Sequence, residues 1–94
     1  MRVKWTRRAL REQDEAFEWI VTENPKAAGE VIERMRAATR LLAGNPRMGR
    51  PGRIARTREF VVTRTPYVMV YRIGAEQVEI LAVIHHARDW PGRL

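Results

Sequence analysis

The sequence predicts an α+β fold in which an N-terminal strand and an antiparallel pair of helices pack on an antiparallel β-sheet. Apolar residues recur at helical spacing through the first half of the chain, whereas the second half contains three short runs rich in β-branched and aromatic residues. The predicted order is therefore strand, helix, helix and three strands. All 94 residues are expected to form one domain, 1–94.

The first half begins with a short strand at Arg2–Trp5, and Thr6 is suited to cap the helix that follows. Asn24 and Pro25 end this helix and begin the next, because asparagine is a good N-cap and proline fits the first helical position. Gly44 marks the end of the second helix. Since only about two residues link the helices, they should form an antiparallel hairpin.

The second half begins with a loop, residues 45–56, that is rich in glycine, proline and arginine. Three strands are predicted after it, at Glu59–Thr63, Tyr67–Ile73 and Val78–Ile84. The middle strand is apolar on both faces, as expected of a central strand. Pro66 precedes it and fits a turn better than a strand interior.

The composition excludes several classes of protein. There is no cysteine, so neither a disulfide nor a cysteine-based zinc site can form. No apolar run approaches the roughly 18 residues that a membrane span needs, and the charged N-terminus does not resemble a signal peptide. A cytoplasmic protein without a membrane partner is therefore expected.

The net charge of +7 is unevenly distributed. Residues 1–44 carry nine basic and seven acidic groups, whereas residues 45–94 carry nine basic and four acidic groups. Five arginines precede the first strand of the second half with no acid among them: Arg47, Arg50, Arg53, Arg56 and Arg58. Because guanidinium groups form forked hydrogen bonds with phosphates and carboxylates, the partner should be nucleic acid, an acidic protein or both.

Five segments carry a resemblance to a known family: NPKAAGEVIERM in the second helix, LAGNPRMGRPGR in the loop, TREFVV and PYVMVYRI in the sheet, and VEILAVIHHARDWP at the end. In this order and spacing, the chain resembles the RelE/ParE superfamily of toxins from bacterial type II toxin–antitoxin modules. The resemblance covers nearly the whole chain. It implies a small basic toxin that is neutralised by a cognate acidic antitoxin in a hetero-oligomer.

The resemblance also implies two possible targets. RelE-like members are ribosome-dependent mRNA endonucleases, and ParE-like members poison DNA gyrase. RelE-type members have lysines on the first strand of this meander and an arginine just after the tyrosine of the next. Here the first strand reads Glu59-Phe60-Val61, and Val68 follows Tyr67. Because valine cannot donate to a phosphate, the ParE-like branch with gyrase as target is favoured; a non-catalytic nucleic-acid-binding module is a further alternative.

Two sets of candidate site residues follow. For a target-binding toxin they are Arg58, Arg64, Arg72, His86, Arg88 and Trp90. For an endonuclease they are Glu59, Arg72, His85, His86 and Arg88.

Several of these residues have an alternative structural role. Arg58 could instead pair with Asp89 or Glu59, and Trp90 is expected to anchor the C-terminal segment on the sheet. Arg72 interrupts an apolar strand, so its side chain should emerge on the open face of the sheet. The two adjacent histidines should point to opposite faces of a strand, so they are not a ligand set, and neither a metal site nor a cofactor is expected.

Overall fold

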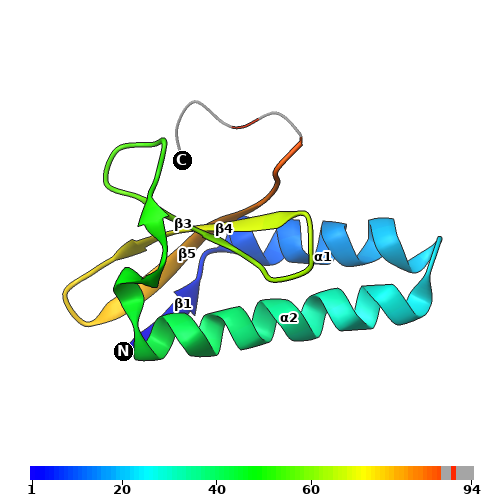
Figure 1. The fold of residues 1–94 in the computed structure, drawn as a ribbon, viewed down its shortest axis with the longest axis horizontal. Coiled ribbons are helices and arrows are strands. Elements are labelled where there is room, and N and C mark those ends of the chain that lie inside the picture. The colour runs from blue at the N-terminus through cyan, green and yellow to red at the C-terminus, as the bar shows by residue number, and fades with distance from the viewer. Residues whose placement is uncertain (88–89, 91–94) are drawn as a thin grey trace.

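The computed structural model describes residues 1–87 and Trp90, and it has two layers (Figure 1). Two antiparallel helices cover one face of a five-stranded sheet. The elements are β1 (Arg2–Trp5), α1 (Arg7–Val21), α2 (Pro25–Gly44), the 3-10 turn η1 (Pro46–Met48), β2 (Arg50–Pro51), β3 (Arg58–Val61), β4 (Tyr67–Ile73) and β5 (Gln77–His85). The predicted α+β class, with a helical hairpin on a sheet, is confirmed.

The strand order is β1-β5-β4-β3-β2. The pairs β2–β3, β3–β4 and β4–β5 are antiparallel, but β1 pairs with β5 in parallel. The sheet is therefore mixed: the predicted strands β3, β4 and β5 are antiparallel, as expected, and the N-terminal strand β1, whose direction was not predicted, joins them in parallel. The four residues of β1 form an edge strand, and their sequence does not encode the direction of the distant strand that they join.

The helix boundaries follow the predicted caps. The Thr6 side chain accepts a hydrogen bond from the Ala9 backbone N–H at 3.1 Å, and the Asn24 side chain accepts one from Ala27 at 3.1 Å. Each cap satisfies a backbone donor that has no partner inside the helix. The second helix ends at Gly44, as predicted.

The main core lies between the helices and the sheet. Its largest fully buried side chains include Met35, Leu42, Met69, Tyr71 and Ile80. A smaller cluster occupies the opposite face of the sheet and consists of Val70, Ala82 and Ile84, with Trp90 packed against it. The central strand β4 thus buries both of its faces, as its sequence predicts.

A β-bulge in β5 determines which residues reach the second face. Tyr71 pairs with Ile80 and Val70 pairs with Ala82, so Leu81 is an extra residue on β5. This extra residue shifts the alternation by one position, and Ala82 joins Val70 on the face away from the helices. The sequence predicted the strand but not the bulge. The observed β5 is also one residue longer at each end, β3 runs one residue earlier and stops at Val61, and the two-residue β2 lies inside the predicted loop.

The loop before β3 is fastened to the sheet by Tyr71 and Arg58. The Tyr71 hydroxyl donates to the Pro46 carbonyl at 2.6 Å and accepts from the Gly49 N–H at 2.9 Å. Arg58 Nε donates to the Gly49 carbonyl at 2.9 Å, and its Nη2 donates to the Arg47 carbonyl at 3.1 Å. These four hydrogen bonds hold the start of the arginine-rich loop on the sheet.

Gly49 leaves no room for a side chain, so Gly49→Ala is expected to destabilise the protein by about 1–3 kcal/mol. A Cβ there would lie 2.6 Å from the Tyr71 hydroxyl and 2.8 Å from the Glu59 carbonyl oxygen, and the backbone oxygen cannot move away cheaply. Urea unfolding measures the loss. Gly29→Ala is the control, because a Cβ at that helical position meets no atom within 4 Å. It should stabilise the protein by about 0.5–1 kcal/mol. Equal effects of the two substitutions would contradict this account of Gly49.

Candidate functional site

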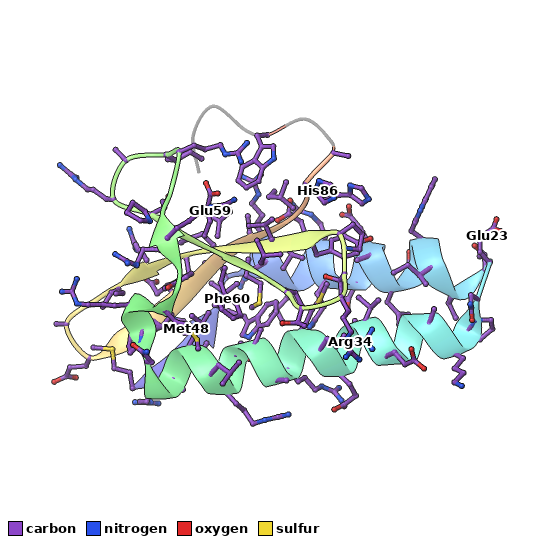
Figure 2. All side chains as sticks on the ribbon, in the orientation of Figure 1. Glu23, Arg34, Met48, Glu59, Phe60 and His86 are labelled. Carbon is purple, nitrogen blue, oxygen red and sulfur yellow. The ribbon has the colours of Figure 1, made fainter. Side chains whose placement is uncertain are left out.

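Two of the charged candidate residues, Glu59 and Arg72, lie on the sheet face that points away from the helices, called the open face below. Directly paired residues of neighbouring strands share a face, and one row across the sheet consists of Arg50, Glu59, Val70 and Ala82. Arg72 lies two residues beyond Val70 on β4 and therefore points to the same face. The arginine-rich loop approaches this face beside Glu59 (Figure 2).

Glu59 is the counter-ion of the loop. Its side chain is only 3% exposed. One carboxylate oxygen accepts from Arg50 Nε and Nη2 at 3.2 and 3.0 Å. The other oxygen accepts from the Arg53 backbone N–H at 2.8 Å and from Arg53 Nε at 3.3 Å. Burial by itself would raise the pKa of this carboxyl, but the bonds from Arg53 and Arg50 outweigh it, so the pKa is lowered and the group is ionised at neutral pH.

Trp90 packs on the open face, in the core role that the sequence predicts. Its ring packs against the cluster of Val70, Ala82 and Ile84. The Arg53 guanidinium lies over the ring, 3.5 Å from its centroid, which is a close cation–π contact. Arg53 therefore links the buried Glu59 carboxylate to the Trp90 ring.

The other candidate arginines lie in different places. Arg72 is exposed on the open face, as predicted, and its Nε donates to Glu79 at 2.7 Å. The predicted ion pair between Arg58 and Glu59 was wrong. Arg58 lies opposite Tyr71 in the register of β3 and β4, so its side chain points to the helix side of the sheet, whereas Glu59 points to the open face. The alternative partner of Arg58, Asp89, lies outside the described residues, as does Arg88, a candidate in both sets.

Arg64 occupies the turn between β3 and β4, away from the loop cluster, with a positive φ of 60°. Arg56, in the loop, has a φ of 65°. Such left-handed conformations are uncommon for residues other than glycine. The structure therefore brings together Arg50, Arg53, Glu59 and Trp90, with Arg72 on the same face, but it does not bring Arg58 or Arg64 into this cluster.

His85 and His86 lie side by side rather than on opposite faces. Their ring centroids are 5.5 Å apart and the rings are nearly parallel, at 20°. The prediction of opposite faces was wrong because β5 ends at His85, so His86 already belongs to a turn. The His86 N–H donates to the Pro66 carbonyl at 2.8 Å, and Tyr67 meets the His85 ring edge-on. Within residues 1–87 and 90, no group of three or more acidic or histidine side chains could hold a metal ion.

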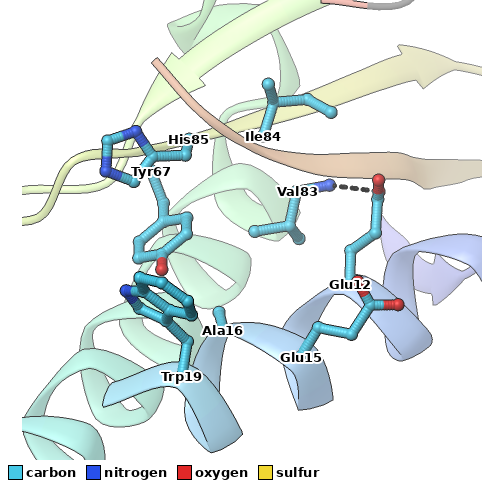
Figure 3. Close-up of a pocket in the computed structure, with 8 residues that line it drawn as sticks. All are labelled: Glu12, Glu15, Ala16, Trp19, Tyr67, Val83, Ile84 and His85. Carbon is cyan, nitrogen blue, oxygen red and sulfur yellow. Dashed lines mark hydrogen bonds between the residues drawn. The ribbon is translucent and has the colours of Figure 1, made fainter. Parts of the chain in front are cut away.

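A cavity of about 280 Å³ lies between α1 and the end of β5 (Figure 3). Its lining residues are Glu12, Glu15, Ala16, Trp19, Tyr67, Val83, Ile84 and His85. Of these, only His85 is among the site candidates predicted from the sequence.

The counter-ion role of Glu59 was not predicted, although the sequence holds a signal for it: Glu59 is the one acidic residue between positions 34 and 75, and it directly follows five arginines. No helix in the described part of the chain is both long and apolar enough to cross a membrane.

Comparison with known proteins identifies the family. Residues 3–90 match the family described as "ParE toxin of type II toxin-antitoxin system, parDE". A curated protein from Sinorhizobium fredii (strain NBRC 101917 / NGR234), named "Putative toxin Y4kP", is 47% identical over 90 residues, covering 96% of this chain and 93% of that protein. A solved structure of the chromosomal ParDE toxin–antitoxin system from P. aeruginosa superposes with a TM-score of 0.81. The superposition covers 90% of this chain and 95% of that chain at 24% sequence identity, so it shows that the two folds are alike. The chain therefore belongs to the ParE toxin family of type II toxin–antitoxin systems.

Proposed function

We propose that this ParE-family toxin acts in the cytoplasm by binding DNA gyrase, and that it does not cut RNA. The observation that carries the proposal is the state of Glu59. RNA cleavage needs a group that removes a proton from the 2′-hydroxyl. Both oxygens of the Glu59 carboxylate already accept hydrogen bonds from Arg50 and Arg53, and the side chain is buried. This carboxylate therefore serves as a counter-ion rather than as a general base.

The surface that remains is suited to binding. The open face presents Arg72, Arg50 and Arg53 beside the anchored Trp90, and Arg47 and Arg56 are exposed on the adjoining loop. Guanidinium groups in a fixed arrangement recognise phosphates and carboxylates in pairs of hydrogen bonds. Gyrase bound to DNA offers both kinds of group. We assign the target contact to this face, with Arg72 as an exposed residue of the central strand, and extend it to His86 and Arg88 by their position in the sequence.

The neutralising partner is proposed to be an acidic antitoxin with a partly disordered tail. The toxin carries a net charge of +7, so association should be fast and sensitive to salt. A groove of about 510 Å³ runs between α1 and α2 and includes the apolar side chains of Phe17 and Ile32. Such a groove suits a tail that folds into an amphipathic helix on contact.

Purified toxin is expected to inhibit supercoiling by gyrase, or to trap gyrase on cleaved DNA, and to leave mRNA on translating ribosomes intact. The reason is the absence of an available general base on β3. A supercoiling assay and a primer-extension assay on translated mRNA distinguish the two activities. Cleavage at codon positions, together with normal supercoiling, would overturn the proposal.

That outcome would favour a second candidate, a ribosome-dependent mRNA endonuclease. The observation that supports it is the stacked pair of His85 and His86 beside Tyr67, since histidine is the side chain most often used for general acid–base catalysis. His85→Ala and His86→Ala would then abolish cleavage. Under the gyrase proposal, neither histidine transfers a proton in a catalysed reaction.

A further inference from the structure

The cavity between α1 and β5 combines carboxylates with aromatic rings. Tyr67 and His85 meet edge-on, with ring centroids 5.5 Å apart, and Trp19 lies below them (Figure 3). Glu12 extends from α1 to the Val83 backbone N–H of β5, and the Glu15 side chain lies beside it (Figure 3). The pocket therefore has an aromatic side and an acidic side.

The two carboxylates differ in how firmly they are placed. Glu12 Oε1 accepts from the Val83 backbone N–H at 3.0 Å, which fixes this side chain against β5. Glu15 is 63% exposed and forms an ion pair with Arg11 at 3.4 Å, on the helix surface. A surface pair of this kind contributes at most about 1 kcal/mol, so Glu15 can exchange its partner at small cost.

Trp19 adds an observation that is independent of the charges. Its side chain is 65% exposed, the highest value among the large hydrophobic side chains in the described part of the chain. Exposed tryptophan is unfavourable in water and is enriched at sites where a partner binds. Its indole face is also the best aromatic surface for a cation. An exposed indole beside an exchangeable carboxylate suits a cationic group.

We propose that this pocket binds an arginine side chain presented by the antitoxin. The volume of about 280 Å³ is enough to accommodate one large side chain. A planar guanidinium can lie against the Trp19 face and donate in a fork to the Glu15 carboxylate. A single cationic residue in an acidic tail would then fix where that tail binds.

Titration of the ¹⁵N-labelled full chain with N-acetyl-arginine amide tests the site directly. The indole N–H signal of Trp19, assigned with Trp19→Phe, is expected to shift in a saturable way. The neutral isostere N-acetyl-citrulline amide should bind about tenfold more weakly, since it has the same shape but lacks the charge. Equal binding of the two probes, or no shift of the Trp19 signal, would overturn the proposal.

Three exposed positions sharpen the test. Glu15→Gln should weaken arginine binding about fivefold, and Arg11→Gln should strengthen it about twofold by freeing the carboxylate. Glu33→Gln is the matched control, because Glu33 is also 63% exposed and pairs with one arginine. It should leave the affinity unchanged. An equal loss from Glu15→Gln and Glu33→Gln would reduce the effect to general charge and overturn the site.

The assignment of the arginine to the antitoxin rests on the proposed function, and a separate measurement tests it. The affinity of the co-purifying antitoxin should fall with Glu15→Gln and stay constant with Glu76→Gln, because Glu76 is exposed in the turn before β5 and lines neither the pocket nor the groove between the helices. If the arginine probe binds but Glu15→Gln leaves antitoxin binding unchanged, the assignment of the occupant is wrong. Neither measurement involves gyrase, so failure of the gyrase proposal would not change their meaning.

Discussion

Glutamine in place of Glu59 is expected to lower the free energy of unfolding by about 2 kcal/mol at neutral pH, as hydrogen bonds to a charged group contribute roughly 1.5–3 kcal/mol. The amide keeps the shape of the carboxyl but cannot accept four bonds from Arg50 and Arg53. Both arginines are exposed enough to be hydrated once unpaired. The loss should therefore stay below the roughly 3–5 kcal/mol typical of a fully buried pair.

The same substitution should flatten the response of stability to acid. The pKa of Glu59 in the folded protein is lowered from the ordinary value of 4.5, so the unfolded chain takes up its proton first as the pH falls. The stabilisation by this carboxylate is complete above about pH 4.5 and is lost as the pH falls through the lower folded value. Wild type should thus lose stability below pH 4.5, and Glu59→Gln should lose less over the same range.

Urea unfolding at several pH values between 7 and 3 measures both effects. Glu79→Gln is the control, because Glu79 is also a strand carboxylate but pairs with the single exposed side chain of Arg72. It should cost less than about 1 kcal/mol. Parallel acid profiles of wild type and Glu59→Gln would contradict the counter-ion role of Glu59.

The parts of the fold that the sequence predicted are those determined locally. The caps Thr6 and Asn24 bond to backbone groups three residues away, so their effect is visible in the sequence itself. The parallel direction of β1 and the bulge at Leu81 depend on contacts between distant segments. The alternation of side chains along a strand does not reveal one inserted residue. Because Leu81 is inserted, Ala82 and Ile84 point to the open face.

The candidate site divides in the same way. The arginines and the exposure of Arg72 on the open face followed from charge and alternation. The contact of Arg53 with Trp90 joins residues far apart in the sequence, and no local pattern predicts it. The two histidines were misplaced because the prediction continued strand geometry one residue past the end of β5. The pocket combines one face of α1 with the ends of two strands, so it exists only once the layers pack.

Alanine at Trp90 is expected to lower the free energy of unfolding by about 3 kcal/mol, the lower end of the values for removing a large buried aromatic side chain. The ring is partly buried, so the loss should not reach the upper end of that range. Removing it uncovers Val70, Ala82 and Ile84 and leaves the Arg53 guanidinium without its aromatic contact. Thermal unfolding followed by circular dichroism should show a melting temperature lower by about 12–24 °C.

Arg72→Ala should have the opposite profile: loss of toxicity with the fold and antitoxin binding retained. Arg72 is 55% exposed, and its pair with Glu79 contributes at most about 1 kcal/mol to stability. Arg36→Ala on α2 is the matched control, since Arg36 is 62% exposed and also pairs with one glutamate. It should leave toxicity intact. Growth assays at equal expression, paired with circular dichroism, distinguish Arg72→Ala from Trp90→Ala and from the control Arg36→Ala. If Arg72→Ala stays as toxic as Arg36→Ala, the open face is not the target-binding surface. The target contact would then be assigned to Arg47 and Arg56, because they are exposed arginines of the same basic half of the chain.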